Sequence, residues 1–325
     1  MDELAEKIGY FLLRAQVTSE EVVRLDDGLG RTLAQEIRAI SDWPPFDRAM
    51  MDGYALDYRA ALKATPESPV EFEVVGVVPA GSVAQVPVEG GQAIKVLTGA
   101  AIPAGANAVA PFEEVEVRGD VVLIRKPLQP WQHVRRRGTV AVEGDLLIPA
   151  GTVVSPREVE VAASVGLASI RVSQEPVVSI IPVGSELVEP GSPLKEGKIY
   201  ASNGYLLAAW TRVWGGHPKR MAQVRDELPA ILAAVQKGLA EGAVVVTTGG
   251  ASYGDYDLAT RVLEALGCME LVRIAPKTAG GPFAGGFIGS KPVLCFSGSP
   301  KAALRSAKLF LKPLLAKMLG RSVNE

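Results

Sequence analysis

The chain contains few of the residues that build disulfide frameworks and zinc sites. Only two cysteines, Cys268 and Cys295, and two histidines, His133 and His217, occur in 325 residues. Small secreted domains held together by disulfides need many more cysteines, and zinc sites usually require a set of Cys and His ligands. We therefore expect neither feature. Both cysteines lie beside apolar residues, which predicts buried thiols.

A strong excess of one charge is also missing, as are long apolar runs. The 34 Lys and Arg residues nearly balance the 36 Asp and Glu residues, and the formal net charge is −2. Duplex binding normally requires a basic excess, so nucleic acid is not expected as a partner. No apolar run reaches the roughly 18 residues that a membrane span needs. The N-terminus carries four charges before Phe11, unlike a signal peptide. The sequence therefore predicts a cytoplasmic protein without a membrane segment.

The composition and length predict a folded protein of several domains. Hydrophobic residues make up 48% and charged residues 22% of the chain, a balance typical of globular proteins. At about 150 residues per domain, two or more domains are expected. We place a helical linker domain at residues 1–45 and 140–173, a β-rich domain inserted at 46–139, and an α/β domain at 174–325.

Local patterns support this division. Leucines and valines recur at helical spacing up to about Ile37, and Thr18–Glu21 is interpreted as a helix start. Trp43-Pro44-Pro45 interrupts that pattern. Short β-rich segments follow at residues 70–78, 92–98, 108–117 and 121–126. Ser155-Pro156-Arg157-Glu158 is typical of a capped helix that would end at Gly166.

The last half alternates apolar strands with helices. The strands are expected at residues 177–181, 243–247 and 292–296, and the helices around 206–210, at 226–239, at 258–266 and from 301. Strands that are apolar throughout are buried on both faces, so this pattern predicts a three-layer α/β domain with a mostly parallel sheet. The fold class is therefore multi-domain α/β.

Three loops should meet at one edge of this sheet. They are Gly184–Glu186, Thr248–Asp257 and Ser297–Pro300, each directly after a strand. In open α/β sheets ligands bind beyond the carboxyl ends of the strands. Glycines let the backbone approach a ligand, and the middle loop adds two carboxylates, as expected for a phosphorylated ligand with a divalent metal. Each loop alone is better explained as a tight turn, because a glycine-rich turn is a weak motif. Three at one edge favour a binding cleft.

Several long motifs resemble the molybdopterin molybdenumtransferases (MoeA, and the E domain of gephyrin). The matching segments, in family order, are Pro45–Ala55, Thr98–Ala100 continuing through Ile102–Val109, Arg135–Gly138, Gly144–Leu147, Ala150–Thr152, Gly184–Val188, Ser202-Asn203 and Thr247–Asp257. The resemblance implies a linker domain, an inserted β domain and a molybdopterin-binding α/β domain. It also implies a homodimer whose cleft joins the β domain of one subunit to the α/β domain of the other. The fourth small domain usual in the family is not expected after Leu319-Gly320.

The resemblance further implies an activity and its residues. The family inserts molybdate into adenylylated molybdopterin and releases AMP, with a divalent cation such as Mg²⁺. The product would then be handed over to other molybdenum cofactor proteins. By motif, the catalytic residues would be Asp52, Thr98, Glu186 and Asp257, with Glu186 and Asp257 also holding the metal. The pterin nucleotide would be bound by Gly249, Gly250, Ser252, Asp226, Lys277 and Ser299.

Each role has a structural alternative. Asp52 could form a turn with Gly53, and Thr98 could satisfy backbone groups at a strand end. Asp226 could cap the helix that it precedes. Glu186 and Asp257 could be solvated, as could the run Arg135–Arg137, although that run could also attract an anion.

The chain departs from the family mainly where anions are handled. Thr139-Val140 occupies an acidic position, Val183-Gly184-Ser185 replaces Thr-Gly-Asp, Gly281 stands where a lysine is expected, and Ser297–Pro300 replaces Pro-Gly-Asn-Pro. Two hypotheses follow. The chain is a divergent molybdopterin molybdenumtransferase, or it is a non-catalytic protein that binds the pterin nucleotide and has lost efficient molybdate transfer.

Overall fold

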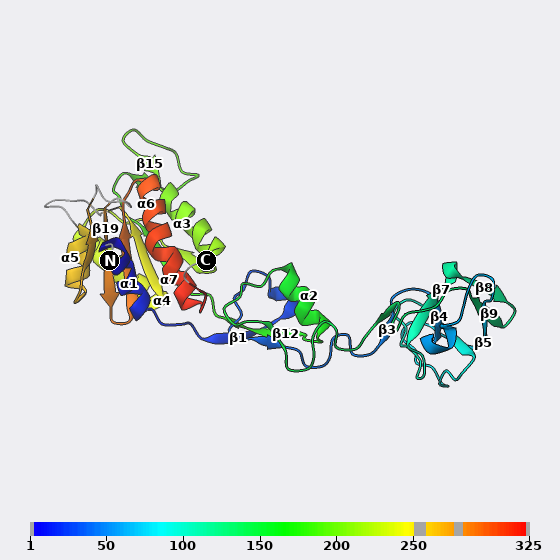
Figure 1. Ribbon diagram of the computed structural model, residues 1–325. Helices are drawn as coiled ribbons and strands as arrows, with labels where there is room; N and C mark the ends of the chain where they lie inside the picture. The colour runs from blue at the N-terminus through cyan, green and yellow to red at the C-terminus, as the bar shows by residue number, and fades with distance from the viewer. Residues whose placement is uncertain (1–2, 250–257, 276–281, 323–325) are drawn as a thin grey trace. The chain divides into compact units, whose positions relative to one another are not determined.

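The computed structural model describes residues 3–249, 258–275 and 282–322 (Figure 1). The chain divides into two compact units. One, called the α/β unit here, comprises residues up to 36, 148–160 and 168 onward; the other, the β unit, comprises residues 37–147 and 161–167. The predicted three-domain division differs in placing residues 1–36 in a separate linker, and it stays a prediction.

The α/β unit is built on a six-stranded sheet in the order β16-β13-β17-β20-β19-β18. Its strands are β13 (Val177–Pro182), β16 (His217–Arg220), β17 (Val244–Thr248), β18 (Val272–Ile274), β19 (Phe283–Ile288) and β20 (Lys291–Phe296). The first four strands in the sheet order are parallel to one another. The fifth, β19, pairs antiparallel with both of its neighbours, β20 and β18. The mostly parallel sheet and its three predicted strands are therefore confirmed.

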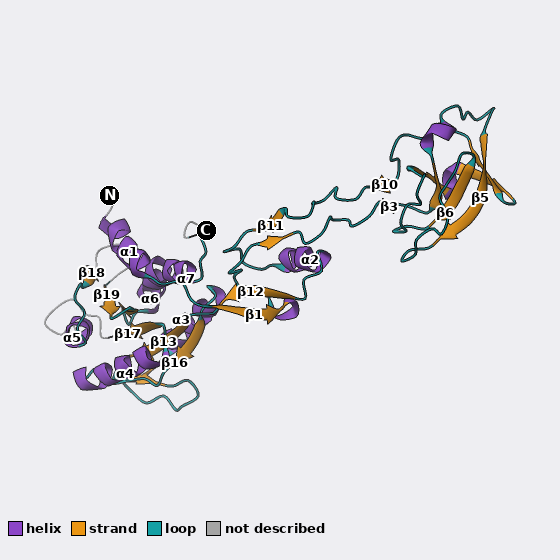
Figure 2. Ribbon diagram, turned by 90° about the horizontal axis from the view of Figure 1, so that it is seen from below, coloured by secondary structure: helices purple, strands orange, loops and turns teal. Residues whose placement is uncertain are grey.

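Helices cover both faces of this sheet (Figure 2). They are α1 (Glu3–Arg14), α3 (Ser202–Val213), α4 (Leu228–Glu241), α5 (Leu258–Ala265), α6 (Pro300–Ser306), the π-helical segment η4 (Ala307–Leu311) and α7 (Lys312–Met318). Along β17, Val244 and Val246 join the core beneath α1, α3, α6 and α7, whereas Val245 joins the core beneath α4 and α5. This alternation explains why each parallel strand is apolar at every position.

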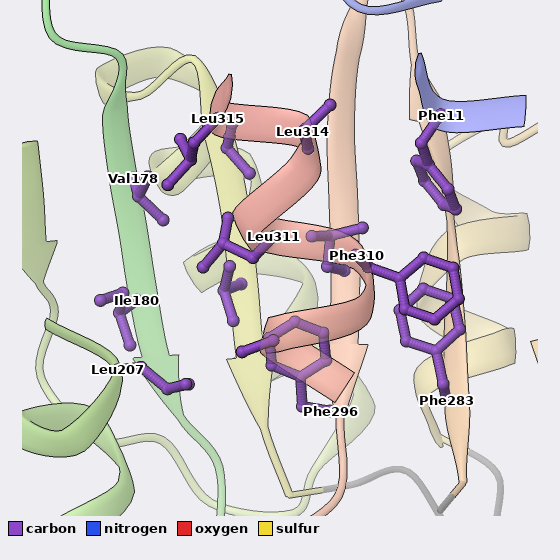
Figure 3. Close-up of a cluster of buried hydrophobic side chains, with 14 of the residues drawn as sticks. Phe11, Val178, Ile180, Leu207, Phe283, Phe296, Phe310, Leu311, Leu314 and Leu315 are labelled. Atoms are coloured by element: carbon purple, nitrogen blue, oxygen red, sulfur yellow. The ribbon is translucent and has the colours of Figure 1, made fainter. Parts of the chain in front are cut away.

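Aromatic side chains anchor α1 and the C-terminal helices to the sheet (Figure 3). The ring of Phe310 stacks on that of Phe283 with centroids 4.0 Å apart, and Phe11 of α1 lies 5.7 Å from Phe310. Phe11 is only 1% exposed. The first helix is thus part of the α/β core.

The predicted helix beginning at Thr18–Glu21 is wrong. Residues Glu20–Arg24 form strand β1, which pairs antiparallel with β12 (Ser169–Ser173), and the 3₁₀ turn η1 (Leu25–Asp27) follows. The Thr18 hydroxyl donates to the carbonyl oxygens of Gln174 and Met318 and does not cap a helix. The residues at helical spacing do not form one buried face, because Val22 and Leu29 are exposed while Leu33 is buried.

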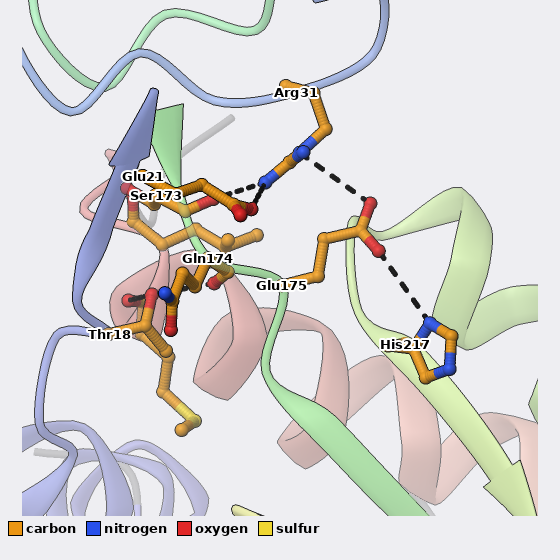
Figure 4. Close-up of polar contacts among 9 residues, drawn as sticks. Thr18, Glu21, Arg31, Ser173, Gln174, Glu175 and His217 are labelled. Carbon is orange, nitrogen blue, oxygen red and sulfur yellow. Dashed lines mark hydrogen bonds and ion pairs between the residues drawn. The ribbon is translucent and has the colours of Figure 1, made fainter. Parts of the chain in front are cut away.

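An arginine network holds the ribbon formed by β1 and β12 in the α/β unit (Figure 4). Arg31 donates to the carbonyl oxygen of Ser173 at 3.0 Å and to the Glu21 carboxylate, and it lies 3.8 Å from Glu175. Glu175 in turn lies 3.9 Å from His217 at the start of β16. The ribbon and the first strands of the sheet are therefore connected through side chains as well as through the chain itself.

The helix α2 (Pro156–Ser164) forms as predicted. Ser155 Oγ accepts from the N–H of Arg157, and the Glu158 carboxylate accepts from the N–H of Ser155, which is a capping box. At the other end Gly166 has a φ of +85°, and the next residue, Leu167, donates its N–H to the Ala162 carbonyl. Gly166 therefore ends the helix.

The β unit contains a second six-stranded sheet in the order β7-β4-β6-β5-β9-β8. Its strands are β4 (Gly53–Leu56), β5 (Val70–Val78), β6 (Gln92–Val96), β7 (Ala108–Pro111), β8 (Val115–Arg118) and β9 (Val121–Ile124), and the 3₁₀ turns are η2 (Tyr58–Ala61) and η3 (Phe112–Glu114). The turn η3 divides the strand predicted at 108–117. The β-rich character of this region is confirmed.

Short strands complete the fold. They are β2 (Ile37–Arg38), β3 (Arg48–Ala49), β10 (Val134–Arg135), β11 (Leu146–Ile148), β14 (Leu187–Val188) and β15 (Ile199–Tyr200). They pair as β2 with β11, β3 with β10, and β14 with β15. Cys295 is buried as predicted, whereas Cys268 is only half-buried. Within the described ranges, no helix has the length and apolarity needed to cross a membrane.

Candidate functional site

The first described residues after β13, β17 and β20 lie together at the carboxyl edge of the α/β sheet, whereas residues 250–257 of the predicted middle loop lie outside the described residues. Gly249 donates its N–H to the Phe296 carbonyl at 3.0 Å, and Val183 donates to the Thr248 carbonyl at 2.8 Å. Gly249 has a φ of +94°, and a Cβ at this position would lie 2.0 Å from the Val183 carbonyl oxygen. Only glycine fits here, so the close approach of the two loops depends on Gly249.

Asp226 supports the loop that carries Glu186. Its carboxylate accepts the N–H of Ser185 at 2.7 Å, and its own N–H donates to Ser185 Oγ at 3.3 Å. The residue that precedes α4 is Glu227, which makes no side-chain capping bond. The alternative that Asp226 caps this helix is therefore wrong. Asp226 connects two loops at the sheet edge.

Glu186 borders a small cleft at this edge. The cleft has a volume of about 70 Å³. It is lined by residues from the ends of β13 and β17, from β14 and β15, from the beginning of α3, and from the loop after β20. A Cβ on Gly184 would lie 2.7 Å and 2.8 Å from the two carboxylate oxygens of Glu186. The Glu186 carboxylate thus folds over a glycine that leaves room for it.

Asn203 is a site residue to which sequence reasoning assigned no role. It lies in the first turn of α3, is 9% exposed, and lines the cleft. Its Nδ2 donates to the Gly298 carbonyl at 2.7 Å, while its Oδ1 has no hydrogen-bond partner among the residues the structure describes. The motif Ser202-Asn203 was noted only for its resemblance to the family. Burial, which would have identified the residue, has no local sequence signal.

The loop Ser297–Pro300 lies close to Gly249. Gly298 lies beside Gly249, since a Cβ on Gly298 would be 3.7 Å from the Gly249 Cα. Ser299 immediately precedes α6, and its N–H donates to Ser297 Oγ at 3.3 Å. Ser299 is therefore at the sheet edge with Gly249.

A second group of predicted residues lies in the β unit. Asp52 Oδ1 accepts both the N–H and the hydroxyl of Thr98, each at 2.7 Å. These two hydrogen bonds, first the one from the backbone N–H and then the one from the hydroxyl, lower the pKa of the Asp52 carboxyl, and Lys95 contributes in the same direction. The pair is exposed, so an ionised carboxylate and a hydroxyl face solvent together. Neither side chain acts only in a local turn.

Gly53 explains why the Asp52 segment can lie against β7. A Cβ on Gly53 would lie 2.2 Å from the Ala110 carbonyl oxygen. Gly53 pairs with Pro111 in β7 and with Val96 in β6, two positions before Thr98. The register of β4 and β6 therefore brings Asp52 and Thr98 together.

Two residues of the arginine run have specific partners. Arg137 donates its N–H to Asp47 at 2.7 Å and its Nε to Asp42 at 2.5 Å, and the Arg136 guanidinium lies 4.6 Å from the centre of the Trp131 ring. The pKa of Asp42 is lowered, first by the N–H of Glu143 and then by Arg137. All three arginines are exposed, so the interpretation of Arg135–Arg137 as a solvated run stays open beside these contacts.

Four predicted site residues, Gly250, Ser252, Asp257 and Lys277, lie outside the described residues. Within the described part of the chain, no three His, Cys, Asp or Glu side chains gather in a way that could hold a metal ion. Mg²⁺ is commonly bound by one or two carboxylates together with substrate phosphates. The exposed Glu186 at the cleft fits that donor set, which makes a metal brought with the substrate compatible with this edge.

A larger hollow of about 430 Å³ lies elsewhere in the α/β unit. It borders Val177 and Lys291 at the amino ends of β13 and β20, together with residues 15–19 and 240–243. Ligands of open α/β sheets bind at the opposite, carboxyl edge. We therefore place the candidate site at the smaller cleft, where the glycines, Glu186 and Asn203 converge.

Comparison with known proteins gives matches along nearly the whole chain. The family described as "MoeA N-terminal region (domain I and II)" matches residues 2–166, and that described as "Probable molybdopterin binding domain" matches residues 179–317. A molybdopterin molybdenumtransferase from Staphylococcus epidermidis is 32% identical over 298 residues, which cover 92% of this chain and 71% of the relative. One from Staphylococcus aureus has the same identity and coverage.

A solved structure agrees. The molybdopterin biosynthesis MoeA protein from Pyrococcus horikoshii is 35% identical, with a TM-score of 0.87, over 98% of this chain and 80% of that protein.

Proposed function

Because the chain belongs to the molybdopterin molybdenumtransferase family, we propose that it inserts molybdate into adenylylated molybdopterin and releases AMP during molybdenum cofactor biosynthesis. The observation that carries the proposal is the convergence of three loops around Gly249, Glu186 and Asn203 at the carboxyl edge of the sheet. This is where an α/β fold binds a phosphorylated ligand. The relatives' activity is consistent with that placement.

The proposed roles follow from the chemistry of each group. The backbone of Gly249 and Gly250, together with Ser252, Lys277 and Ser299, would bind the pterin nucleotide. Asp226 positions the Glu186 loop through Ser185. A bare carboxylate repels phosphate, so Glu186 is compatible with the nucleotide only when a cation lies between them. We therefore propose that Glu186 and Asp257 hold Mg²⁺, which would neutralise phosphate charge.

Asp52 and Thr98 would act from the β unit. The lowered pKa of Asp52 keeps its carboxylate ionised near neutral pH. An ionised Asp52 with an adjacent Thr98 hydroxyl can orient a hydrogen-bond donor of the substrate. We propose that the protein forms a homodimer in which these residues complete the cleft of the partner's α/β unit. A cytoplasmic location and hand-over of the product to other molybdenum cofactor proteins complete the proposal.

Reconstitution tests the activity. Purified protein is mixed with adenylylated molybdopterin, molybdate and Mg²⁺, and the AMP released is measured. We expect turnover by the wild-type chain and a large loss in Glu186→Gln, which keeps the shape and removes the charge. Glu196→Gln, an exposed residue in the following loop, is the matched control. Nucleotide binding without any AMP release would instead establish the non-catalytic binding role, which the departures at Ser185 and Gly281 motivate.

A further inference from the structure

The Asn203 side chain presents a hydrogen-bond acceptor that the described residues leave unused. The residue is 9% exposed, and its Oδ1 is buried without a hydrogen-bond partner among them. Buried side-chain polar atoms are nearly always paired, because leaving one unpaired costs free energy. An unpaired acceptor in a cleft wall therefore indicates a group that arrives with a ligand.

The hydrogen bond made by Asn203 Nδ2 determines the orientation of the Asn203 amide. The Gly298 carbonyl, 2.7 Å from Asn203 Nδ2, can only accept a hydrogen bond. The NH₂ group must therefore face Gly298, and the oxygen must be the atom left over. That oxygen can receive an N–H or O–H donor and has nothing to offer a phosphate oxygen. The unpaired atom thus favours a hydrogen-bond donor of the ligand over an anionic group.

The position of Asn203 places this acceptor within the proposed site. Asn203 lines the same cleft as Glu186 and Thr248, the last residue of β17. Its partner Gly298 lies in the loop beside Gly249. The cleft volume of about 70 Å³ is enough for an amino or hydroxyl group, but not for a whole pterin nucleotide. The acceptor therefore meets only one part of the ligand.

We propose that Asn203 is a specificity-determining residue whose Oδ1 accepts a hydrogen bond from an N–H or hydroxyl donor of the bound pterin nucleotide. The inference rests on the proposed function, because it requires that nucleotide at the carboxyl edge. The donor is either an N–H group of the pterin or a hydroxyl of the adenylyl part. In both cases Asn203 recognises a neutral donor and, through Nδ2, holds the Ser297–Pro300 loop.

Two substitutions separate recognition from loop support. Asn203→Ala removes both the acceptor and the donor to Gly298. Asn203→Asp keeps an acceptor toward the cleft but removes the donor to Gly298. Binding of adenylylated molybdopterin, molybdopterin and AMP to the full chain is measured by titration calorimetry, with thermal melting to verify folding. We expect Asn203→Ala to weaken adenylylated molybdopterin about tenfold, the value of one lost hydrogen bond, and Asn203→Asp to bind at least several-fold better than Asn203→Ala.

The ligands identify the donor. If Asn203→Ala weakens the binding of molybdopterin, the donor belongs to the pterin. If it weakens the binding of AMP, the donor is a hydroxyl of the adenylyl part. Equal weakening in both variants would reduce Asn203 to loop support and overturn the proposal. Weaker binding by Asn203→Asp than by Asn203→Ala would place an anion there and also overturn it, as would wild-type affinity in Asn203→Ala. If the wild-type chain bound none of the three ligands, the proposed function itself would fail.

Discussion

Gly249→Ala tests whether the close contact between two loops builds the site. The substitution places a Cβ 2.0 Å from the Val183 carbonyl oxygen in a residue with a φ of +94°. An alanine held in left-handed conformation costs about 1–2 kcal/mol, and relief of an overpacked contact costs about 1–3 kcal/mol. We expect the free energy of unfolding to fall by about 2–5 kcal/mol.

The functional effect should exceed the loss of stability. Val183 directly precedes the loop that carries Glu186, so a shift that relieves the contact moves the cleft wall. Displacements near 1 Å can cost about a hundredfold in rate. We expect AMP release to fall on that order in protein that is still folded at the assay temperature. Denaturant unfolding and the reconstitution assay measure the two quantities.

Gly289→Ala is the matched control. Gly289 lies in the turn between β19 and β20 of the same sheet, with a φ of +60°, and no atom lies within 4 Å of a Cβ built there. Gly289→Ala places an alanine in left-handed conformation without the steric contact. We therefore expect the free energy of unfolding to fall by about 1–2 kcal/mol and AMP release to stay normal. If Gly249→Ala matched this control in both stability and AMP release, the loop contact would have no part in building the site.

Three further substitutions test the fold and the β unit. Phe11→Ala should lower the free energy of unfolding by about 3–5 kcal/mol in denaturant titrations, because it leaves a cavity in the core. Leu13→Ala, at an exposed position of the same helix, should change it by less than about 0.5 kcal/mol. Similar values for the two variants would contradict the packing of α1 in the core. Thr98→Val removes the hydroxyl donor, so the pKa of Asp52 should rise toward its ordinary value and the acid limb of the pH–activity profile should move to higher pH, with Thr98→Ser unchanged. The sign follows because the ionised carboxylate is the proposed active form, so a higher pKa lets protonation remove activity at higher pH. An unmoved limb would remove Asp52 from the activity. Ser155→Ala removes a helix cap and should cost about 1 kcal/mol by thermal melting, and an unchanged melting temperature would contradict the capping box.

The parallel strands could be predicted because their burial on both faces leaves a local signature. Val244–Thr248 is buried at every position, and no amphipathic helix shows such a run. The antiparallel strand β19 was missed because Gly285-Gly286 interrupts its apolar pattern. Those glycines are required by packing, since a Cβ on Gly286 would lie 2.3 Å from the Cys268 sulfur. That contact joins distant segments and has no local signal.

The helix predicted after Thr18 shows the opposite limit. Val22 and Leu29 lie at helical spacing but are exposed, and β1 instead pairs with β12, about 150 residues away in the chain. Tertiary pairing overrides a weak periodicity of this kind. The pairing of Asp52 with Thr98 is similarly non-local, and the family resemblance gave both residues a role without predicting their contact.

The departure at Ser185 shows how a site can change its charge and keep its shape. Family members have an aspartate at this position, yet the bonds seen here use the Ser185 N–H and Oγ. The first comes from the backbone and needs no particular side chain; the second needs only an oxygen near the γ position. The loop that carries Glu186 is therefore tied to Asp226 without the family carboxylate. In the proposed complex, one fewer negative charge would face the phosphates, which would weaken both their repulsion and the attraction for a cation. We therefore expect the Asp-to-Ser difference to change the affinity for the proposed metal more than the geometry of the loop.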